Sequence, residues 1–259
     1  MRDYAIVIAG GRIEDDFALG FLISAGADCA ADCAGGLPAL STPAEKSASG
    51  RKAQRSSEAD AKAPPLLIAA DRGLAFLDRH GIVPDLVVGD FDSAGDAFVR
   101  RYLSDHPQVE VHRFGWEKDY TDTEIAVRMA LEKGCRRIDL LGTTGTRVDH
   151  MLGSVQLLAM LLEEGAEGRI LDPCNRISMH REGFQIRKDA QWGKYVSFFA
   201  WGGAVGGLTL TGFHFPMKDG TITQDRTIAV SNQIEEETAR VSFRSGTLLM
   251  VESKDTPEA

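Results

Sequence analysis

Two carboxylates follow the end of an apolar run at residues 84–93, and their spacing suits metal binding. The segment reads Pro-Asp-Leu-Val-Val-Gly-Asp-Phe-Asp-Ser, so Asp90 and Asp92 come directly after a β-branched run. Side chains two residues apart in a strand share one face, so the two carboxylates can face one point. Mg²⁺ is typically held by one or two carboxylates together with phosphates and water. On spacing alone, an equally good alternative is that Asp92 or Ser93 caps a helix that begins near Asp96.

A further acid, Asp71, follows the apolar residues 66–70, which predict a second buried strand. Ligands of open α/β sheets bind in the crevice outside the carboxyl ends of the strands. We therefore expect Asp71, Asp90 and Asp92 to face one cleft. Capping of the helix expected over residues 74–79 would place an acid at the same position for structural reasons alone.

A cation and two more acids lie close together in Lys118-Asp-Tyr-Thr-Asp122. Thr121 and Glu124 have the spacing of a capping box, which predicts that a helix begins here. Free backbone N–H groups at a helix start attract anions, so Lys118 could hold a phosphate while Asp119 or Asp122 binds metal. Acids in a first helical turn also occur without any function, because they complement the helix dipole.

The loop after the predicted strand at residues 137–142 carries an arginine and an Asp-His pair. It reads Thr-Thr-Gly-Thr-Arg-Val-Asp-His over residues 143–150 and precedes an amphipathic helix. Arg147 suits bidentate phosphate binding, and Asp149 could orient His150 or complete a metal shell. A lone Arg or His is more often an ion-paired surface residue, but this loop also follows a strand end.

Alternation of short apolar runs with helical patterns predicts an α/β domain with a mostly parallel sheet over residues 1–168. Its first strand, residues 4–9, ends in Gly10-Gly11, where the lack of side chains could let a phosphate approach the backbone. Residues 27–63 are rich in Ala, Ser, Gly, Lys and Pro, so we expect a mobile surface insertion there.

From residue 169 the pattern changes to short alternating strands separated by glycine turns, for example at 195–200 and 208–211. We expect residues 169–259 to form an all-β domain, a sandwich or a barrel.

Composition excludes several classes of partner. The net charge of -9 argues against nucleic acid and anionic membranes, because both are bound through Lys and Arg.

No apolar run reaches the roughly 18 to 20 residues of a membrane span, and residues 4–9 are too short for a secretory signal. The four cysteines lack the spacing of a zinc site or a disulfide framework. We therefore expect a cytoplasmic protein.

Several motifs, in this order and at these separations, resemble the thiamine pyrophosphokinase family. The matching pieces are Ala70-Asp-Arg-Gly73, Pro84-Asp85 with Gly89-Asp-Phe-Asp-Ser93, Lys118-Asp-x-Thr-Asp122, Gly142-x-x-Gly-x-Arg-x-Asp-His150, Leu208-Thr-Leu-Thr-Gly212, Ser231-Asn232 and Ser245-Gly246. Each motif alone is weak, but the ordered set is specific and covers most of the chain outside residues 27–63.

The resemblance implies an N-terminal domain that binds ATP and Mg²⁺, a C-terminal domain that contributes to a thiamine pocket, and a homodimer with active sites near the subunit interface. The reaction would transfer pyrophosphate from ATP to the hydroxyethyl oxygen of thiamine, giving thiamine diphosphate and AMP. By matched position, the catalytic and metal-binding acids would be Asp71, Asp90, Asp92 and Asp122. The nucleotide side would comprise Lys118, Asp119, Arg147, Asp149 and His150, and the thiamine side Ser231 and Asn232.

Phosphoryl-type transfer asks mainly for positioning and charge neutralisation, which clustered carboxylates, Mg²⁺ and one or two cations supply. Two alternatives are transfer to another heteroaromatic alcohol and a non-catalytic regulator that binds nucleotide or thiamine. The chain departs from the family pattern in three places: the insertion at 27–63, Arg72 where a small residue is more usual, and Gln233 where an acid is common. Arg72 bears on nucleotide preference, and Gln233 bears on the thiamine pocket.

Overall fold

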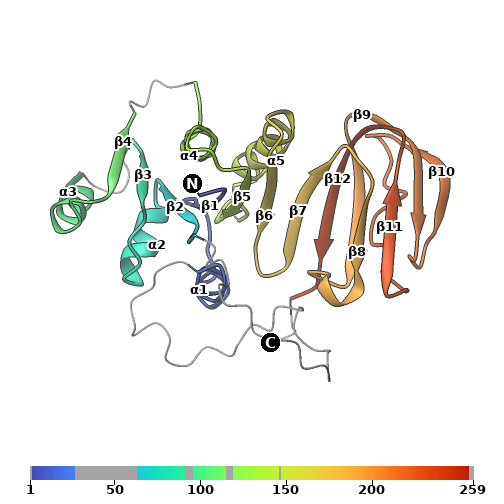
Figure 1. Cartoon of the computed structure of the whole chain (residues 1–259), viewed down its shortest axis with the longest axis horizontal. Coiled ribbons are helices and arrows are strands. Elements are labelled where there is room, and N and C mark those ends of the chain that lie inside the picture. The colour runs from blue at the N-terminus through green and yellow to red at the C-terminus, as the bar shows by residue number, and fades with distance from the viewer. Residues whose placement is uncertain (1, 27–62, 91–95, 115–118, 146, 257–259) are drawn as a thin grey trace, which may run out of the picture.

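The computed structural model describes residues 2–26, 63–90, 96–114, 119–145 and 147–256 (Figure 1). Its helices are α1 (Asp15–Ser24), α2 (Gly73–Arg79), α3 (Asp96–Asp105), α4 (Asp122–Glu132) and α5 (Val148–Glu163). Its strands are β1 (Tyr4–Ile8), β2 (Leu66–Ala70), β3 (Leu86–Gly89), β4 (Glu110–Arg113), β5 (Arg137–Leu141), β6 (Glu167–Leu171), β7 (Asn175–His180), β8 (Phe184–Arg187), β9 (Tyr195–Thr211), β10 (Met217–Ile222), β11 (Thr238–Ser242) and β12 (Ser245–Ser253). Apart from Ala63, the expected insertion at 27–63 lies outside the described residues.

One sheet runs through the described chain in the order β4-β3-β2-β1-β5-β6-β7-β12-β9-β11-β8, with β10 paired to β9. The strands from β4 to β6 are parallel, and the pairs from β6 onward are antiparallel. This confirms the predicted α/β part with a mostly parallel sheet and the β-rich C-terminal part. The expected boundary at 168/169 falls inside β6, which pairs with β5 on one side and β7 on the other.

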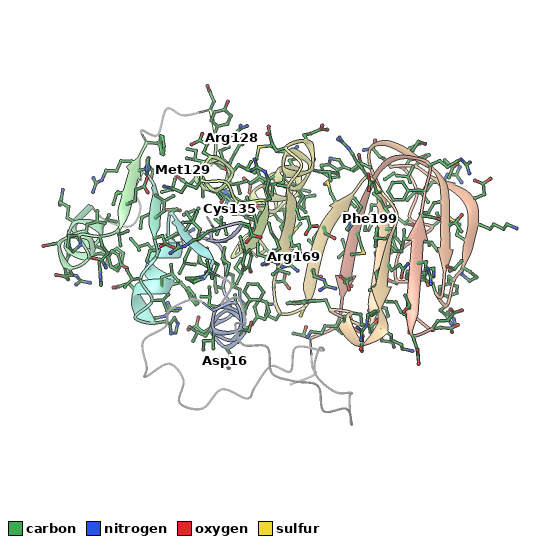
Figure 2. The ribbon with its side chains drawn as sticks, viewed as in Figure 1. Asp16, Arg128, Met129, Cys135, Arg169 and Phe199 are labelled. Carbon is green, nitrogen blue, oxygen red and sulfur yellow. The ribbon has the colours of Figure 1, made fainter. Side chains whose placement is uncertain are left out.

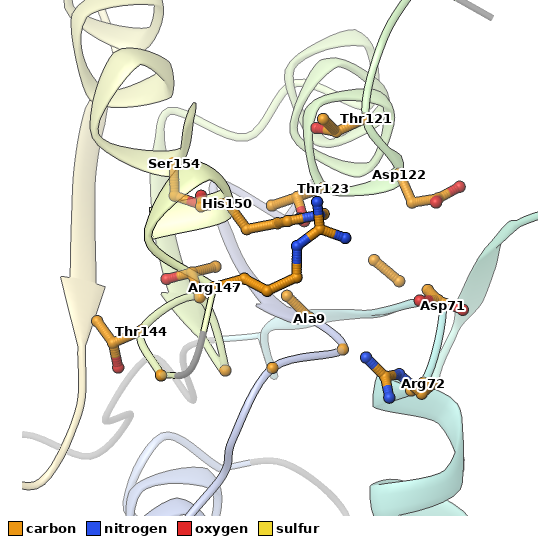
Figure 3. A pocket seen from close by; sticks show the side chains of 16 residues that line it. Ala9, Asp71, Arg72, Thr121, Asp122, Thr123, Thr144, Arg147, His150 and Ser154 are labelled. Carbon is orange, nitrogen blue, oxygen red and sulfur yellow. The ribbon is translucent and has the colours of Figure 1, made fainter. Parts of the chain in front are cut away.

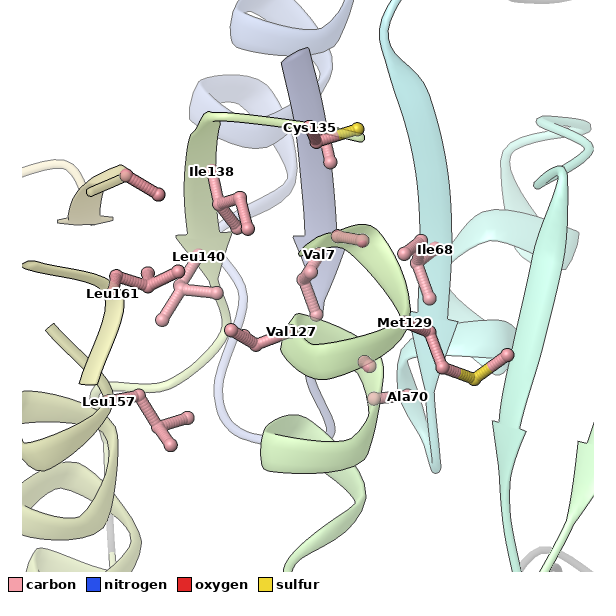
Figure 4. Close-up of a cluster of buried hydrophobic side chains, with 14 of the residues drawn as sticks. Val7, Ile68, Ala70, Val127, Met129, Cys135, Ile138, Leu140, Leu157 and Leu161 are labelled. Atoms are coloured by element: carbon pink, nitrogen blue, oxygen red, sulfur yellow. The ribbon is translucent and has the colours of Figure 1, made fainter. Parts of the chain in front are cut away.

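Helices cover both faces of the parallel part. Alternate residues of each strand point to opposite faces, so Val7 packs against α4 and α5 while Ile6 and Ile8 pack against α1 and α2. Figure 4 shows the first of these cores, where Val127 of α4 and Leu157 of α5 lie over Val7 and Leu140. The second core is closed by Leu22 of α1, Leu77 of α2 and Val99 of α3.

The C-terminal part is built on β9, a single strand of 17 residues. Its first half pairs with β12, and its second half pairs with β11 and β10. The middle contains Gly202 and Gly207, both with φ near +70°, which lets the strand bend and close a separate core around Phe198, Leu208 and Phe213. The segments expected at 195–200 and 208–211 are thus two ends of one strand.

A buried polar network joins three neighbouring strands. The Asp139 carboxylate is fully buried; it accepts two hydrogen bonds from Arg169, at 2.7 and 2.6 Å, and one of 2.8 Å from the Tyr4 hydroxyl. Burial, and then the neighbouring carboxylate, raise the pKa of Tyr4 well above its ordinary value. Figure 2 shows Arg169 at the junction of the two parts, whereas Asp16 and Arg128 extend outward. Among the described helices, none is long and apolar enough to cross a membrane.

Candidate active site

A pocket of about 440 Å³ opens at the carboxyl ends of β1, β2 and β5 (Figure 3). After β1 the chain adds β2, β3 and β4 on one side and then returns to place β5 on the other, so the strand order reverses at β1. Open α/β sheets bind ligands at such a switch point. The lining residues in the described chain are Ala9, Gly10, Gly11, Ala70, Asp71, Arg72, Thr121, Asp122, Thr123, Gly142, Thr143, Thr144, Gly145, Arg147, His150 and Ser154.

Glycines bring the loops after β1 and β5 together at the base of the pocket. The Gly11 N–H donates a 2.8 Å hydrogen bond to the Gly142 carbonyl. A Cβ on Gly11 would lie 2.4 Å from that oxygen, so only glycine fits there. Gly10 and Gly11 both line the pocket, and the approach of a phosphate to the backbone there stays a prediction.

Two of the predicted acids face the pocket from different elements. Asp71 directly follows β2 at a φ of 50°, and its N–H donates a 2.9 Å hydrogen bond to the Val88 carbonyl of β3. A positive φ in a residue other than glycine is uncommon and often marks a functional position. Asp122 is the first residue of α4, whose Thr121 side chain caps the helix by accepting a 3.1 Å bond from Glu124 N–H. The expected capping box is therefore half formed, and Asp122 is one of the residues that line the pocket (Figure 3).

The other predicted acids lie beside or beyond the described lining. Asp90 follows β3, the strand adjacent to β2, and is half-buried but is not among the lining residues. Asp119 is exposed three residues before the start of α4. Asp92 and Lys118 fall outside the described residues.

The donors present suit a hard divalent cation bound together with a phosphate ligand. Within the described part of the chain no three His, Cys, Asp or Glu side chains are grouped closely enough to hold a metal alone. Mg²⁺ does not require such a cage, because it keeps several waters and takes one or two carboxylates plus phosphate oxygens. Asp71 and Asp122, which line one pocket, are the two carboxylates that could hold such an ion.

The start of α5 supplies positive charge. Arg147 occupies its N-cap and pairs with Asp149, with Nε 3.1 Å from Oδ1 and Nη2 2.5 Å from Oδ2. The guanidinium holds the pKa of Asp149 down at about 2, and the backbone N–H of His150, 3.0 Å from Oδ1, adds to this effect. Arg147 and His150 line the pocket, whereas Asp149 contacts Arg147 and is absent from the described lining. Asp149 therefore orients Arg147 rather than the His150 ring.

The C-terminal candidates Ser231 and Asn232 lie in the antiparallel part, away from the described lining of this pocket. Asn232 is buried, and its Oδ1 accepts 2.9 Å bonds from the N–H groups of Phe215 and Gln233. Its Nδ2 donates a 2.8 Å bond to the Phe215 carbonyl. Ser231 is exposed at a φ of 58°. A contact of either residue with thiamine stays a prediction, and the Asn232 amide has a clear role within the fold.

Hydroxyl side chains of the pocket were not singled out from the sequence. Thr123, Thr143, Thr144 and Ser154 line it, and Ser154 donates a 2.9 Å bond to the His150 carbonyl one turn earlier in α5. The Thr143 hydroxyl is buried and has no hydrogen-bond partner among the described residues. The spacing of His150 and Ser154, four residues apart on a helix, was the available signal.

Comparison with known proteins shows the family of this chain. Residues 60–168 match the family model described as thiamin pyrophosphokinase, catalytic domain, and residues 183–248 match thiamin pyrophosphokinase, vitamin B1 binding domain. The thiamine pyrophosphokinase of Bacillus subtilis (strain 168) is 37% identical over 191 residues, which cover 73% of this chain and 88% of that protein. The chain belongs to the thiamine pyrophosphokinase family. The pocket lies between elements of the segment that matches the catalytic domain, apart from Ala9, Gly10 and Gly11.

Solved structures of thiamine pyrophosphokinases share the whole fold. The Bacillus subtilis structure superposes with a TM-score of 0.73 and 28% identity, covering 98% of this chain and 100% of that chain. The Geobacillus thermodenitrificans structure gives 0.72 and 27%, covering 98% and 99%. The yeast structure, at 13% identity and a TM-score of 0.70 over 97% of this chain and 86% of that chain, shares the fold. The joined parallel and antiparallel parts are therefore the architecture of the family.

Proposed function

We propose that the protein transfers the pyrophosphoryl group of ATP to the hydroxyethyl oxygen of thiamine in the presence of Mg²⁺, forming thiamine diphosphate and AMP. One observation carries the proposal: Asp71 and Asp122 share a single pocket with Arg147 at the switch point of the sheet. That arrangement offers carboxylates for a metal and a cation for phosphate in a chain that belongs to the thiamine pyrophosphokinase family.

The protein's contribution is mainly to hold charges in place. Arg147 and the backbone N–H groups at the start of α5 neutralise phosphate oxygens, and Gly10 and Gly11 let the phosphate chain approach the loop after β1. Asp71 and Asp122 would hold Mg²⁺, whose charge would further neutralise the triphosphate. Asp90 and Asp92 would be further acids around the metal. The nucleotide would also contact Lys118, Asp119 and His150.

The bond changes are those of an in-line substitution at the β-phosphorus. The thiamine oxygen bonds to that phosphorus, the bond from the β-phosphorus to the α,β-bridging oxygen breaks, and AMP leaves. The hydroxyl proton passes to a carboxylate, for which Asp71, which lines the pocket, and Asp92 are the candidates. Ser231 and Asn232 would contribute to thiamine binding from the C-terminal part.

A homodimer would bring a second subunit beside this pocket. Val148 and Leu152, one turn apart on α5, are 59% and 52% exposed, and Phe215 and Ile228 of the C-terminal part are 62% and 69% exposed. Larger exposed apolar patches mark sites of protein–protein contact, so these side chains are the candidates for the interface. Leu152→Glu is expected to convert a dimer into a monomer in light scattering coupled to gel filtration, and a wild-type monomer at micromolar concentration would refute the dimer.

The deciding experiment is product analysis with ATP, Mg²⁺ and thiamine. We expect thiamine diphosphate and AMP in equal amounts, whereas formation of ADP would reject pyrophosphoryl transfer. A panel of other heteroaromatic alcohols tests acceptor choice. Binding of both ligands without turnover would instead favour a regulator, and the same assay detects that outcome.

A further inference from the structure

A second guanidinium, that of Arg72, lines the pocket opposite Arg147. Arg72 follows Asp71 at the turn from β2 to α2, whereas Arg147 comes from the start of α5 (Figure 3). They are the two arginines among the described lining residues. Arg72 follows β2 and Arg147 follows β5, and these strands lie on opposite sides of β1. A ligand that fills the cavity would lie between them.

The two arginines differ in what already neutralises them. Arg147 is paired with Asp149 through two hydrogen bonds. Arg72 is exposed, makes no capping bond to α2, and has no carboxylate partner within the part of the chain that the structure describes. Arg72 is therefore the lining arginine whose charge no carboxylate of the described residues offsets.

The backbone fixes where the Arg72 side chain begins. The positive φ of Asp71 turns the chain sharply after β2, and a Cβ on Gly10 would lie 3.3 Å from Arg72 Cβ and 3.2 Å from Arg72 N. A Cβ on Gly73 would lie 2.0 Å from the Ile8 carbonyl, so the turn is packed directly on the end of β1. Arg72 thus starts beside the Gly10-Gly11 loop, which lines the pocket.

We propose that Arg72 binds the phosphate groups of the nucleotide and so sets the preference of the pocket for more highly phosphorylated nucleotides. Its planar, charged fork holds two N–H donors in the geometry that matches two phosphate oxygens, whereas a lysine acts as a point charge and a glutamine carries no charge. The inference rests on the proposed function, because it takes a nucleoside triphosphate as the ligand. The shared chemistry, a diphosphate group, also occurs in thiamine diphosphate.

The test measures binding of ATP, ADP, AMP, adenosine and thiamine diphosphate by calorimetry, each alone with Mg²⁺, to the full-length protein. Arg72→Gln removes the charge and Arg72→Lys keeps it without the fork. Arg181→Gln is the matched control, because Arg181 is an exposed arginine that pairs with Glu163 and its loss changes the net charge equally.

We expect Arg72→Gln to raise the Kd of ATP by about 10- to 100-fold, the range for a charge-assisted hydrogen bond, and to leave that of adenosine within about twofold. Arg72→Lys should fall between Arg72→Gln and the wild type, and Arg181→Gln should match the wild type. Equal losses for adenosine and ATP, an unchanged ATP affinity, or a loss confined to thiamine diphosphate would each overturn the proposal.

This outcome is separable from that of the proposed reaction. Nucleotide binding is measured without thiamine, so a phosphate-dependent loss in Arg72→Gln supports the role of Arg72 even if no thiamine diphosphate forms. If the wild type forms thiamine diphosphate and Arg72→Gln binds ATP normally, the role of Arg72 is rejected and the reaction stands.

Discussion

The Arg147 guanidinium is bound by the carboxylate of Asp149 through two hydrogen bonds at the start of α5. Both side chains are exposed, so the pair adds little to stability, and its value lies in holding the fork of Arg147 in one orientation beside the pocket. Asp149 is in this sense a positioning residue, whose effect on the ligand passes through Arg147.

A double-mutant cycle tests that relationship. We expect Arg147→Ala to lower kcat/KM for ATP by roughly 10²- to 10³-fold, as for the loss of one charge-stabilising donor, and Asp149→Asn to lower it by about tenfold. Because Asp149 acts through Arg147, the double variant should be no worse than Arg147→Ala alone. Additive losses would show that Asp149 contacts the substrate or metal itself. Unfolding curves should be unchanged in all three variants.

Asp71 is the acid for which charge and backbone conformation can be separated. Its φ of 50° is one that Asn also adopts readily, so Asp71→Asn should keep the fold while removing the negative charge. We expect kcat to fall on the order of 10²-fold and the Mg²⁺ concentration for half-maximal rate to rise. Asp71→Ala should show the same loss of activity and should lower the unfolding free energy by about 1 kcal/mol more. Full activity of Asp71→Asn would remove Asp71 from the metal site.

The sequence predicted best what depends on local pattern. Buried parallel strands appear as nearly continuous apolar runs, so the ends of β1, β2 and β5 were located, and with them Asp71 and Arg147. Asp122 followed from the capping pattern at Thr121. The positions of residues at strand ends and helix starts could thus be predicted from spacing alone.

The features that the sequence did not predict depend on long-range strand pairing or on single hydroxyl groups. Glycines within β9 suggest turns, but pairing with β12, β11 and β10 keeps it one strand, and only tertiary contacts determine that. Thr143 and Ser154 enter the pocket through the way their loop and helix pack, and an isolated hydroxyl leaves no periodic signal. Asn232 was predicted from a matched motif, yet its amide bonds to Phe215, which is 17 residues away.

Asn232 and Ser231 should therefore respond differently to truncation. Asn232→Ala leaves the Phe215 N–H and C=O groups without their side-chain partner, so we expect a loss of about 2 kcal/mol or more in urea unfolding. Ser231→Ala removes only an exposed hydroxyl and should change stability by less than about 0.5 kcal/mol. A rise in KM for thiamine in Ser231→Ala with unchanged stability would support its predicted contact with thiamine, and an unchanged KM would argue against it.

His180 makes stability depend on pH in a defined window. Its ring is stacked on Phe184 with centroids 4.0 Å apart, its Nε2 lies 2.9 Å from the Ser178 hydroxyl, and burial lowers its pKa from 6.5 to about 4. Since the unfolded chain takes up a proton below about 6.5 and the folded chain only near 4, the stabilisation is complete above 6.5 and is lost as the pH falls toward 4.

Urea unfolding of the wild type should accordingly show a free energy that declines between pH 7 and pH 5, with a contribution from His180 of at most about 1.4 kcal/mol per pH unit. The glutamine in His180→Gln keeps a polar group near Ser178 but does not titrate. The unfolding free energy of this variant should therefore change less steeply with pH over the same range, whatever its value at pH 7. If the slope of the variant equals that of the wild type, the buried imidazole is not the source of the pH dependence.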